Sequence, residues 1–85
     1  MPGSLIEIDL TGCQVLVVGL GPVGRRRARR LRQDGAEVRA VDPRAWRDDR
    51  ELAGLDVRAE PFRPEHLDGV VLAIAATGLS AGRRV

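Results

Sequence analysis

The sequence predicts an α/β domain with a mostly parallel β-sheet. Short apolar runs at residues 13–18 and 70–76 are typical of strands buried on both faces, as in parallel sheets. Helical and strand patterns alternate between these runs, as they do in βαβ units. The 85 residues contain no repeat, low-complexity tract or linker, so we expect a single domain covering residues 1–85.

The first half of the chain predicts a strand followed by a helix. Residues 5–10 alternate weakly, which indicates an edge segment, and residues 13–18 form the first clear strand. Pro22 suits the first turn of a helix, which we expect to run to about residue 34 before Gly35 ends it. The stripe of this helix that would face the sheet comprises Gly24, Ala28, Leu31 and Gly35.

The second half of the chain predicts three strands and little helix. A strand at residues 37–41 precedes a short, frayed helix at residues 45–53. Residues 56–60 alternate and indicate a third strand, residues 64–67 a single turn, and residues 70–76 the last strand. Strands that usually complete such a sheet do not follow, so we expect the fold to be truncated at its C-terminus.

Composition excludes several classes of protein. Apolar residues make up 44% of the chain and charged residues 31%, which indicates a folded domain rather than a disordered one. No apolar run approaches the roughly 18 residues of a membrane span. Acids near the N-terminus argue against a secretion signal, and the single cysteine, Cys13, cannot form an internal disulfide. We therefore expect a cytoplasmic protein with a buried, inert thiol and no membrane partner.

Arginines give the chain its basic character. With 14 basic and 12 acidic residues the formal net charge is +2, and six of the arginines fall between residues 25 and 32. A helix with so many arginines could bind the phosphates of a nucleic acid. However, only Trp46 and Phe62 are available for base stacking, and the sequence has no helix-turn-helix or zinc-ligand pattern. We expect a solvated helix face without a nucleic-acid partner, and one that could attract an anionic small substrate.

A Gly-x-Gly-x-x-Gly motif follows the first strand directly and opens the helix. Its residues are Gly19-Leu20-Gly21-Pro22-Val23-Gly24, and the second strand ends in an acid, Asp42, 18 residues beyond Gly24. In this context the motif is the dinucleotide-binding fingerprint of Rossmann-like domains. The alternative is a tight strand-to-helix turn without a ligand, because glycine accounts for 10 of the 85 residues.

The motif assigns a role to each of its glycines. Gly19 would make the tight turn, Gly21 would let the backbone approach a pyrophosphate, and Gly24 would let the helix lie on the sheet. The free N–H groups at the helix start would face the phosphates. Asp42 would accept hydrogen bonds from ribose hydroxyls, which favours NAD over NADP, although Arg44 could instead accommodate a 2′-phosphate.

Outside this motif the candidate chemistry is sparse. His66 lies in a predicted surface turn without a cysteine or acid cluster, so we expect no metal site, and a surface histidine rather than a general base. Thr77 and Gly78 follow the last strand at the sheet edge where ligands bind, and they either line the cofactor cleft or form a simple turn.

With these segments in place, the chain resembles the N-terminal domain of siroheme synthases, the precorrin-2 dehydrogenase family, from about residue 5 to residue 85. The resemblance is carried by Ile8-Asp9-Leu10-Thr11-Gly12, residues 15–19, Gly21-Pro22-Val23, Gly35-Ala36-Glu37-Val38, Pro61-Phe62, Leu67-Asp68-Gly69 and Leu72-Ala73-Ile74-Ala75-Ala76-Thr77. It implies an NAD-dependent oxidoreductase that oxidises precorrin-2, an anionic tetrapyrrole, to sirohydrochlorin in siroheme biosynthesis, a branch of porphyrin biosynthesis. The motif and the resemblance together give as cofactor-binding residues Gly19, Gly21, Pro22, Val23, Gly24, Asp42, Pro43, Ala76 and Thr77.

Departures from this family leave the activity open. They fall at Leu20, Gly78, Leu79 and Gly82. The family's catalytic aspartate and the parts that form its homodimer lie in a segment beyond residue 85, so the resemblance assigns no catalytic residue here. One alternative is a non-catalytic dinucleotide-binding module. Another is a nucleotide-binding domain like that of the muramyl ligases, which have a similar start, but their Gly-x-x-x-x-Gly-Lys-Ser/Thr loop requires a lysine that this chain lacks.

Overall fold

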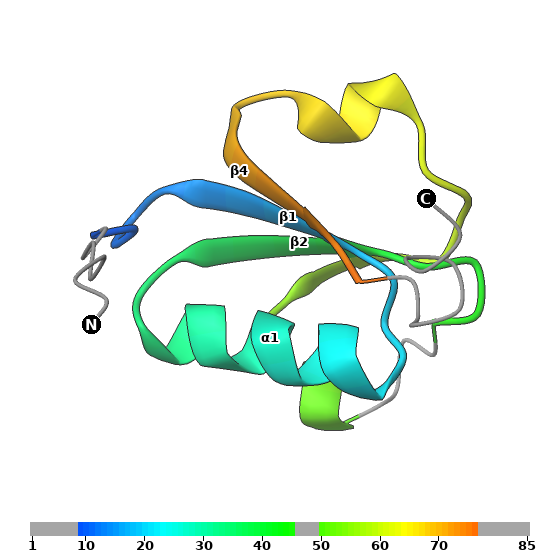
Figure 1. The fold of residues 1–85 in the computed structure, drawn as a ribbon, viewed down its shortest axis with the longest axis horizontal. Helices are drawn as coiled ribbons and strands as arrows, with labels where there is room; N and C mark the ends of the chain where they lie inside the picture. The colour runs from blue at the N-terminus through cyan, green and yellow to red at the C-terminus, as the bar shows by residue number, and fades with distance from the viewer. Residues whose placement is uncertain (1–8, 46–49, 77–85) are drawn as a thin grey trace, which may run out of the picture.

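In the described residues, four strands form one sheet in the order β3-β2-β1-β4 (Figure 1). The structure is a computed structural model that describes residues 9–45 and 50–76. Its elements are β1 (Gln14–Val18), α1 (Pro22–Gln33), β2 (Glu37–Val41), η1 (Arg50–Leu52), β3 (Asp56–Arg58), η2 (Pro64–Leu67) and β4 (Val70–Ala75). Each pairing between neighbouring strands is parallel, so the predicted α/β fold class is confirmed.

Helix α1 begins and ends where the sequence predicts. Gly21 is the N-cap residue, and Pro22 occupies the first turn of the helix. Backbone N–H groups in the first turn have no partner within the helix, so the missing N–H of proline costs no hydrogen bond there. Gly35 follows the helix with a φ of 98°, in the left-handed region that favours glycine. The buried residues of α1 are Gly24 and Ala28, so the helix presents small side chains to the sheet and lies close to it. No helix in the described ranges is long and apolar enough to cross a membrane.

The core lies between α1 and the sheet. Its buried side chains come from alternate positions of β1 and β2, from the helix and from the loops that flank them: Val15, Val17, Leu20, Ala28, Ala36, Val38, Ala40 and Leu52. Alternation along β1 and β2 sends every second residue toward α1, as the two-residue period of a strand requires. The strand ends that carry the glycine motif and Asp42 are therefore fixed by buried neighbours.

The connection from β3 to β4, which includes η2, crosses the face of the sheet opposite α1 (Figure 1). Arg39 of β2 ties this connection to the sheet. Its guanidinium donates to the carbonyl oxygens of His66 at 2.7 Å and Asp68 at 3.3 Å, and it pairs with the Asp56 carboxylate at 3.4 Å. Because the Arg39 side chain is only 16% exposed, these charged hydrogen bonds are largely shielded from water and hold η2 against β2.

Three expectations about β4, Cys13 and the N-terminal edge segment differ from the structure. The apolar residues 70–75 form β4 at the edge of the described sheet, where Val71 and Leu72 are exposed rather than buried on both faces. Cys13 is half-buried and not fully buried, because it precedes β1 and does not lie within the strand. Residues 9 and 10 of the predicted edge segment form no strand. The remainder of that segment, and residues 46–49 of the predicted short helix, lie outside the described residues.

Candidate functional site

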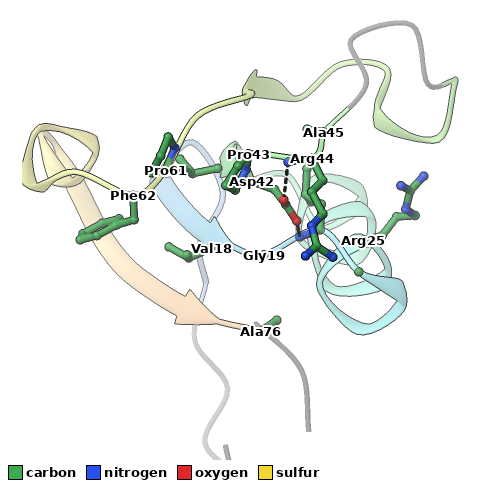
Figure 2. Close-up of a pocket in the computed structure, with 13 residues that line it drawn as sticks. Val18, Gly19, Arg25, Asp42, Pro43, Arg44, Ala45, Pro61, Phe62 and Ala76 are labelled. Atoms are coloured by element: carbon green, nitrogen blue, oxygen red, sulfur yellow. Dashed lines mark hydrogen bonds between the residues drawn. The ribbon is translucent and has the colours of Figure 1, made fainter. Parts of the chain in front are cut away.

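The carboxyl ends of β1, β2 and β4 meet at one edge of the sheet and form a pocket of about 640 Å³ (Figure 2). Register places Val18 of β1 between Val41 of β2 and Ala75 of β4. The residue after each strand therefore reaches the same edge, where ligands of open α/β sheets bind. The described lining residues are Val18, Gly19, Leu20, Gly21, Arg25, Val41, Asp42, Pro43, Arg44, Ala45, Pro61, Phe62 and Ala76.

The glycine loop turns sharply from β1 into α1. Gly19 has a φ of 100°, and its N–H donates to the carbonyl of Val41 at 2.8 Å, which fixes the turn to the end of β2. Gly24 lies directly beneath this turn. A Cβ on Gly24 would come within 1.8 Å of the Gly19 carbonyl oxygen, so only glycine lets the helix approach the loop this closely. Both roles that the motif predicts for these two glycines are met.

Gly21 occupies a different environment from Gly19 and Gly24. Its φ of −69° is available to any residue, and a Cβ built on it would meet no atom within 4 Å. The protein fold therefore does not require glycine at this position. What a side chain here would obstruct is the space in front of the α1 N-terminus, where backbone N–H groups and the helix dipole favour an anion.

Asp42 connects the end of β2 to the glycine loop. Its Oδ2 accepts the Leu20 N–H at 2.7 Å, and its Oδ1 accepts the Arg44 N–H at 2.8 Å, the bonds drawn as dashed lines in Figure 2. Each carboxylate oxygen keeps a second lone-pair direction. Since Leu20 is buried in the core, these bonds hold the half-buried carboxylate rigidly on the pocket wall.

The pocket has a cationic side. Arg25, in the first turns of α1, and Arg44, just after β2, both line it, and Figure 2 shows them on the side of the pocket away from Phe62. The Arg25 guanidinium also forms an ion pair with Glu51 at 3.0 Å, which holds its side chain across α1 toward η1. Two guanidinium groups beside a helix N-terminus make this side suitable for a phosphate-bearing ligand.

The structure brings together most of the predicted cofactor-binding residues, but not all of them. Those that line the pocket are Gly19, Gly21, Asp42, Pro43 and Ala76. Pro22, Val23 and Gly24 belong to the first turn of α1 and do not line it; the Val23 side chain instead faces a separate shallow groove beside Ile74. Thr77 lies outside the described residues.

The motif argument missed the part of the pocket that the connection between β3 and β4 contributes. Pro61 and Phe62 come from the connection between β3 and β4, and the Phe62 side chain is 45% exposed. No spacing rule relates this segment to the glycine loop, because the two come together only when the connection between β3 and β4 crosses the face of the sheet. The one available sequence signal for this part of the pocket was Phe62 itself, a large apolar residue in an otherwise polar loop.

His66 was predicted on the surface without a partner, and this prediction is wrong. The residue is 4% exposed, its Nε2 donates to the Glu60 carboxylate at 2.5 Å, and its Nδ1 accepts the Arg63 N–H at 2.8 Å. The hydrogen bond from His66 holds the pKa of Glu60 below its ordinary value, and the nearby positive charges of Arg63 and Arg58 lower it further. Within the described residues, no three His, Cys, Asp or Glu side chains cluster as a metal site would require.

Known proteins resemble this chain over nearly its whole length. The family model NAD_binding_7, described as "Putative NAD(P)-binding", matches residues 6–84. Siroheme synthase from Photobacterium profundum is 42% identical over 79 residues, which cover 89% of this chain and 17% of the relative. Siroheme synthase from Ectopseudomonas mendocina is 44% identical over 69 residues, 80% of this chain and 15% of the relative.

A solved structure supports the same relationship. SirC, precorrin-2 dehydrogenase, superposes with a TM-score of 0.75 and 30% sequence identity, covering 94% of this chain and 42% of the solved one. The chain thus spans less than a fifth of each siroheme synthase and less than half of SirC. The predicted resemblance to siroheme synthases and precorrin-2 dehydrogenases is confirmed, as is a nicotinamide dinucleotide as the cofactor class. With its parallel sheet, its glycine loop and the match over residues 6–84, the chain belongs to this NAD(P)-binding family.

Proposed function

We propose that the pocket at the carboxyl edge of the sheet binds NAD. The observation that carries this proposal is the open space in front of Gly21, at an α1 N-terminus where no side chain caps the helix. A pyrophosphate would accept hydrogen bonds from the N–H groups there. The free lone pairs of Asp42 would accept the adenosine ribose hydroxyls, and a carboxylate at this position repels a 2′-phosphate, which favours NAD over NADP.

We further propose that the chain supplies the cofactor-binding part of a precorrin-2 dehydrogenase. Support comes from the similarity to SirC and to siroheme synthases, and from the arginines of α1, whose charge suits a polycarboxylate tetrapyrrole. Bound NAD would accept a hydride from the substrate. The residues described here would bind and orient the dinucleotide. A single-domain organisation and a homodimer remain predictions.

A second candidate is a dinucleotide-binding module without turnover. Among the described lining residues, the side chains that carry charge are Arg25, Asp42 and Arg44. Both oxygens of the one carboxylate already accept backbone N–H groups, so it is poorly placed to move a proton. This candidate predicts saturable NAD binding by the chain with no oxidation of precorrin-2.

Calorimetric titration of the full chain with NAD tests the site. Gly21→Ala should weaken binding, and Gly21→Asp should abolish it, because the added methyl or carboxylate enters the space assigned to the pyrophosphate. Ala53→Asp adds the same charge at an exposed position outside the pocket and should bind like wild type. Full NAD affinity in Gly21→Asp would refute the assignment. Assays with precorrin-2 and NAD then separate the two candidates.

A further inference from the structure

Phe62 is unusually exposed for a large apolar side chain beside a binding pocket. Its side chain is 45% exposed and lines the pocket together with Val18 and Ala76. Figure 2 shows it on the opposite side of Val18 from Arg25 and Arg44. Exposing an aromatic ring to water is unfavourable, so a ligand that covers it would gain apolar burial.

Contacts with neighbouring side chains fix the position of the Phe62 ring. It contacts the His66 ring with the centroids 5.9 Å apart and the planes tilted by 47°. The His66 ring is fixed at both nitrogens, by the Glu60 carboxylate and by the Arg63 N–H. Arg39 of β2 in turn donates to the His66 carbonyl at 2.7 Å. Phe62 is therefore held relative to the sheet, although it lies on an irregular connection.

The order of the chemical groups along a dinucleotide indicates which of them would contact the Phe62 ring. This step rests on the proposed function: the ribose of adenosine lies at Asp42 and the pyrophosphate lies at the glycine loop. A ligand that continues past the loop, away from the cationic side, reaches Val18, Ala76 and Phe62. The group at that end of NAD is the nicotinamide.

We infer that Phe62 forms the nicotinamide contact of this pocket and favours the oxidised cofactor. The oxidised ring is a pyridinium cation and the reduced ring is neutral. A cation gains an electrostatic attraction to an aromatic face that a neutral ring lacks. An aromatic side chain here therefore stabilises bound NAD⁺ more than bound NADH, which suits a protein that must take up the oxidised form and release the reduced form.

Three ligands and three variants test this inference by calorimetric titration of the full chain. The ligands are NAD⁺, NADH and ADP-ribose, which lacks the nicotinamide. Phe62→Ala should weaken NAD⁺ binding about three- to tenfold and leave ADP-ribose within about twofold of wild type. Phe62→Leu keeps apolar bulk without an aromatic face, so it should lower the preference for NAD⁺ over NADH. The matched control is Leu67→Ala, which truncates a similarly exposed side chain of η2 outside the pocket and should change no affinity.

Each outcome has a distinct meaning. Equal losses of NAD⁺ and ADP-ribose in Phe62→Ala would place Phe62 against the adenosine half or the pyrophosphate and overturn the inference. An unchanged ratio of NAD⁺ to NADH affinity in Phe62→Leu would overturn the preference for the oxidised form. Failure of the wild-type chain to bind ADP-ribose would refute the proposed site itself. The selective loss of NAD⁺ with ADP-ribose retained supports the inference.

Discussion

Gly24→Ala is expected to destabilise the fold although it adds only one methyl group. The added Cβ would lie 1.8 Å from the Gly19 carbonyl oxygen, 2.8 Å from the Gly19 carbonyl carbon and 3.3 Å from the Ala76 Cβ. Comfortable contact between such atoms requires about 3.5 Å. Helix α1 and the turn at Gly19 must therefore separate by roughly 1.7 Å, and the backbone cannot move aside as a flexible side chain does.

The cost follows from the size of this domain. Overpacking of a well-packed site costs about 1–3 kcal/mol. A domain of this length has a total stability of roughly 4–13 kcal/mol, and each 1 kcal/mol lost lowers Tm by about 4–8 °C. We expect Gly24→Ala to lower Tm by about 4–24 °C and to weaken NAD binding as well, because the displaced helix carries the N-terminus assigned to the pyrophosphate.

Gly21→Ala is the matched control for this prediction. The same methyl group at Gly21 meets no atom within 4 Å, so Tm should change by less than about 4 °C while NAD affinity falls. Thermal unfolding followed by far-UV circular dichroism measures both variants. A Tm for Gly24→Ala within about 2 °C of wild type, or an equal loss of Tm in Gly21→Ala, would refute the claim that these two glycines serve different purposes.

Three further changes test other contacts. Asp42→Ala should weaken NAD binding by roughly 10- to 100-fold, the value of charged hydrogen bonds, and narrow the preference over NADP; calorimetry that finds the preference unchanged would leave Asp42 a simple strand-end acid. Arg39→Met should lower the free energy of unfolding in urea by about 1–3 kcal/mol, because it removes the hydrogen bonds that tie η2 to β2. Arg58→Met removes a more exposed partner of the same aspartate and should be clearly less destabilising, so similar losses in the two variants would contradict this difference. The pKa of Glu60 is lowered in the folded state by the His66 hydrogen bond, so its stabilisation is present above its ordinary value of 4.5 and is lost as pH falls through the lower folded value. The difference in Tm between wild type and Glu60→Gln should accordingly be larger at pH 7 than at pH 3, and a difference independent of pH would contradict it.

Local patterns predict most of this fold because its elements are specified locally. The apolar strand before Gly19, the proline in the first turn of α1 and the glycine after its end each act within a few residues. The parallel order follows, since the connections are long enough for crossovers. The exposure of β4 was not predictable from its composition, because an apolar run does not show whether another strand lies beside it.

The predictable part of the site is the part within the glycine motif and at the end of β2. Phe62 was missed and His66 was wrongly placed on the surface, because the surroundings of both residues are built by tertiary contacts. His66 becomes buried when Glu60 and Arg63 close around it and Arg39 anchors its carbonyl from another strand. None of these contacts follows a helical or strand period, so pattern reasoning treats the segment as a solvated loop.

The most direct test of the proposed site is a calorimetric titration of the chain with NAD and then with NADP. We predict saturable one-to-one binding that is tighter for NAD, and that is lost in Gly21→Asp while its unfolding transition stays close to that of wild type. A folded wild-type chain that binds neither cofactor would contradict the proposal, because the glycine loop and Asp42 would then shape the fold without holding a dinucleotide.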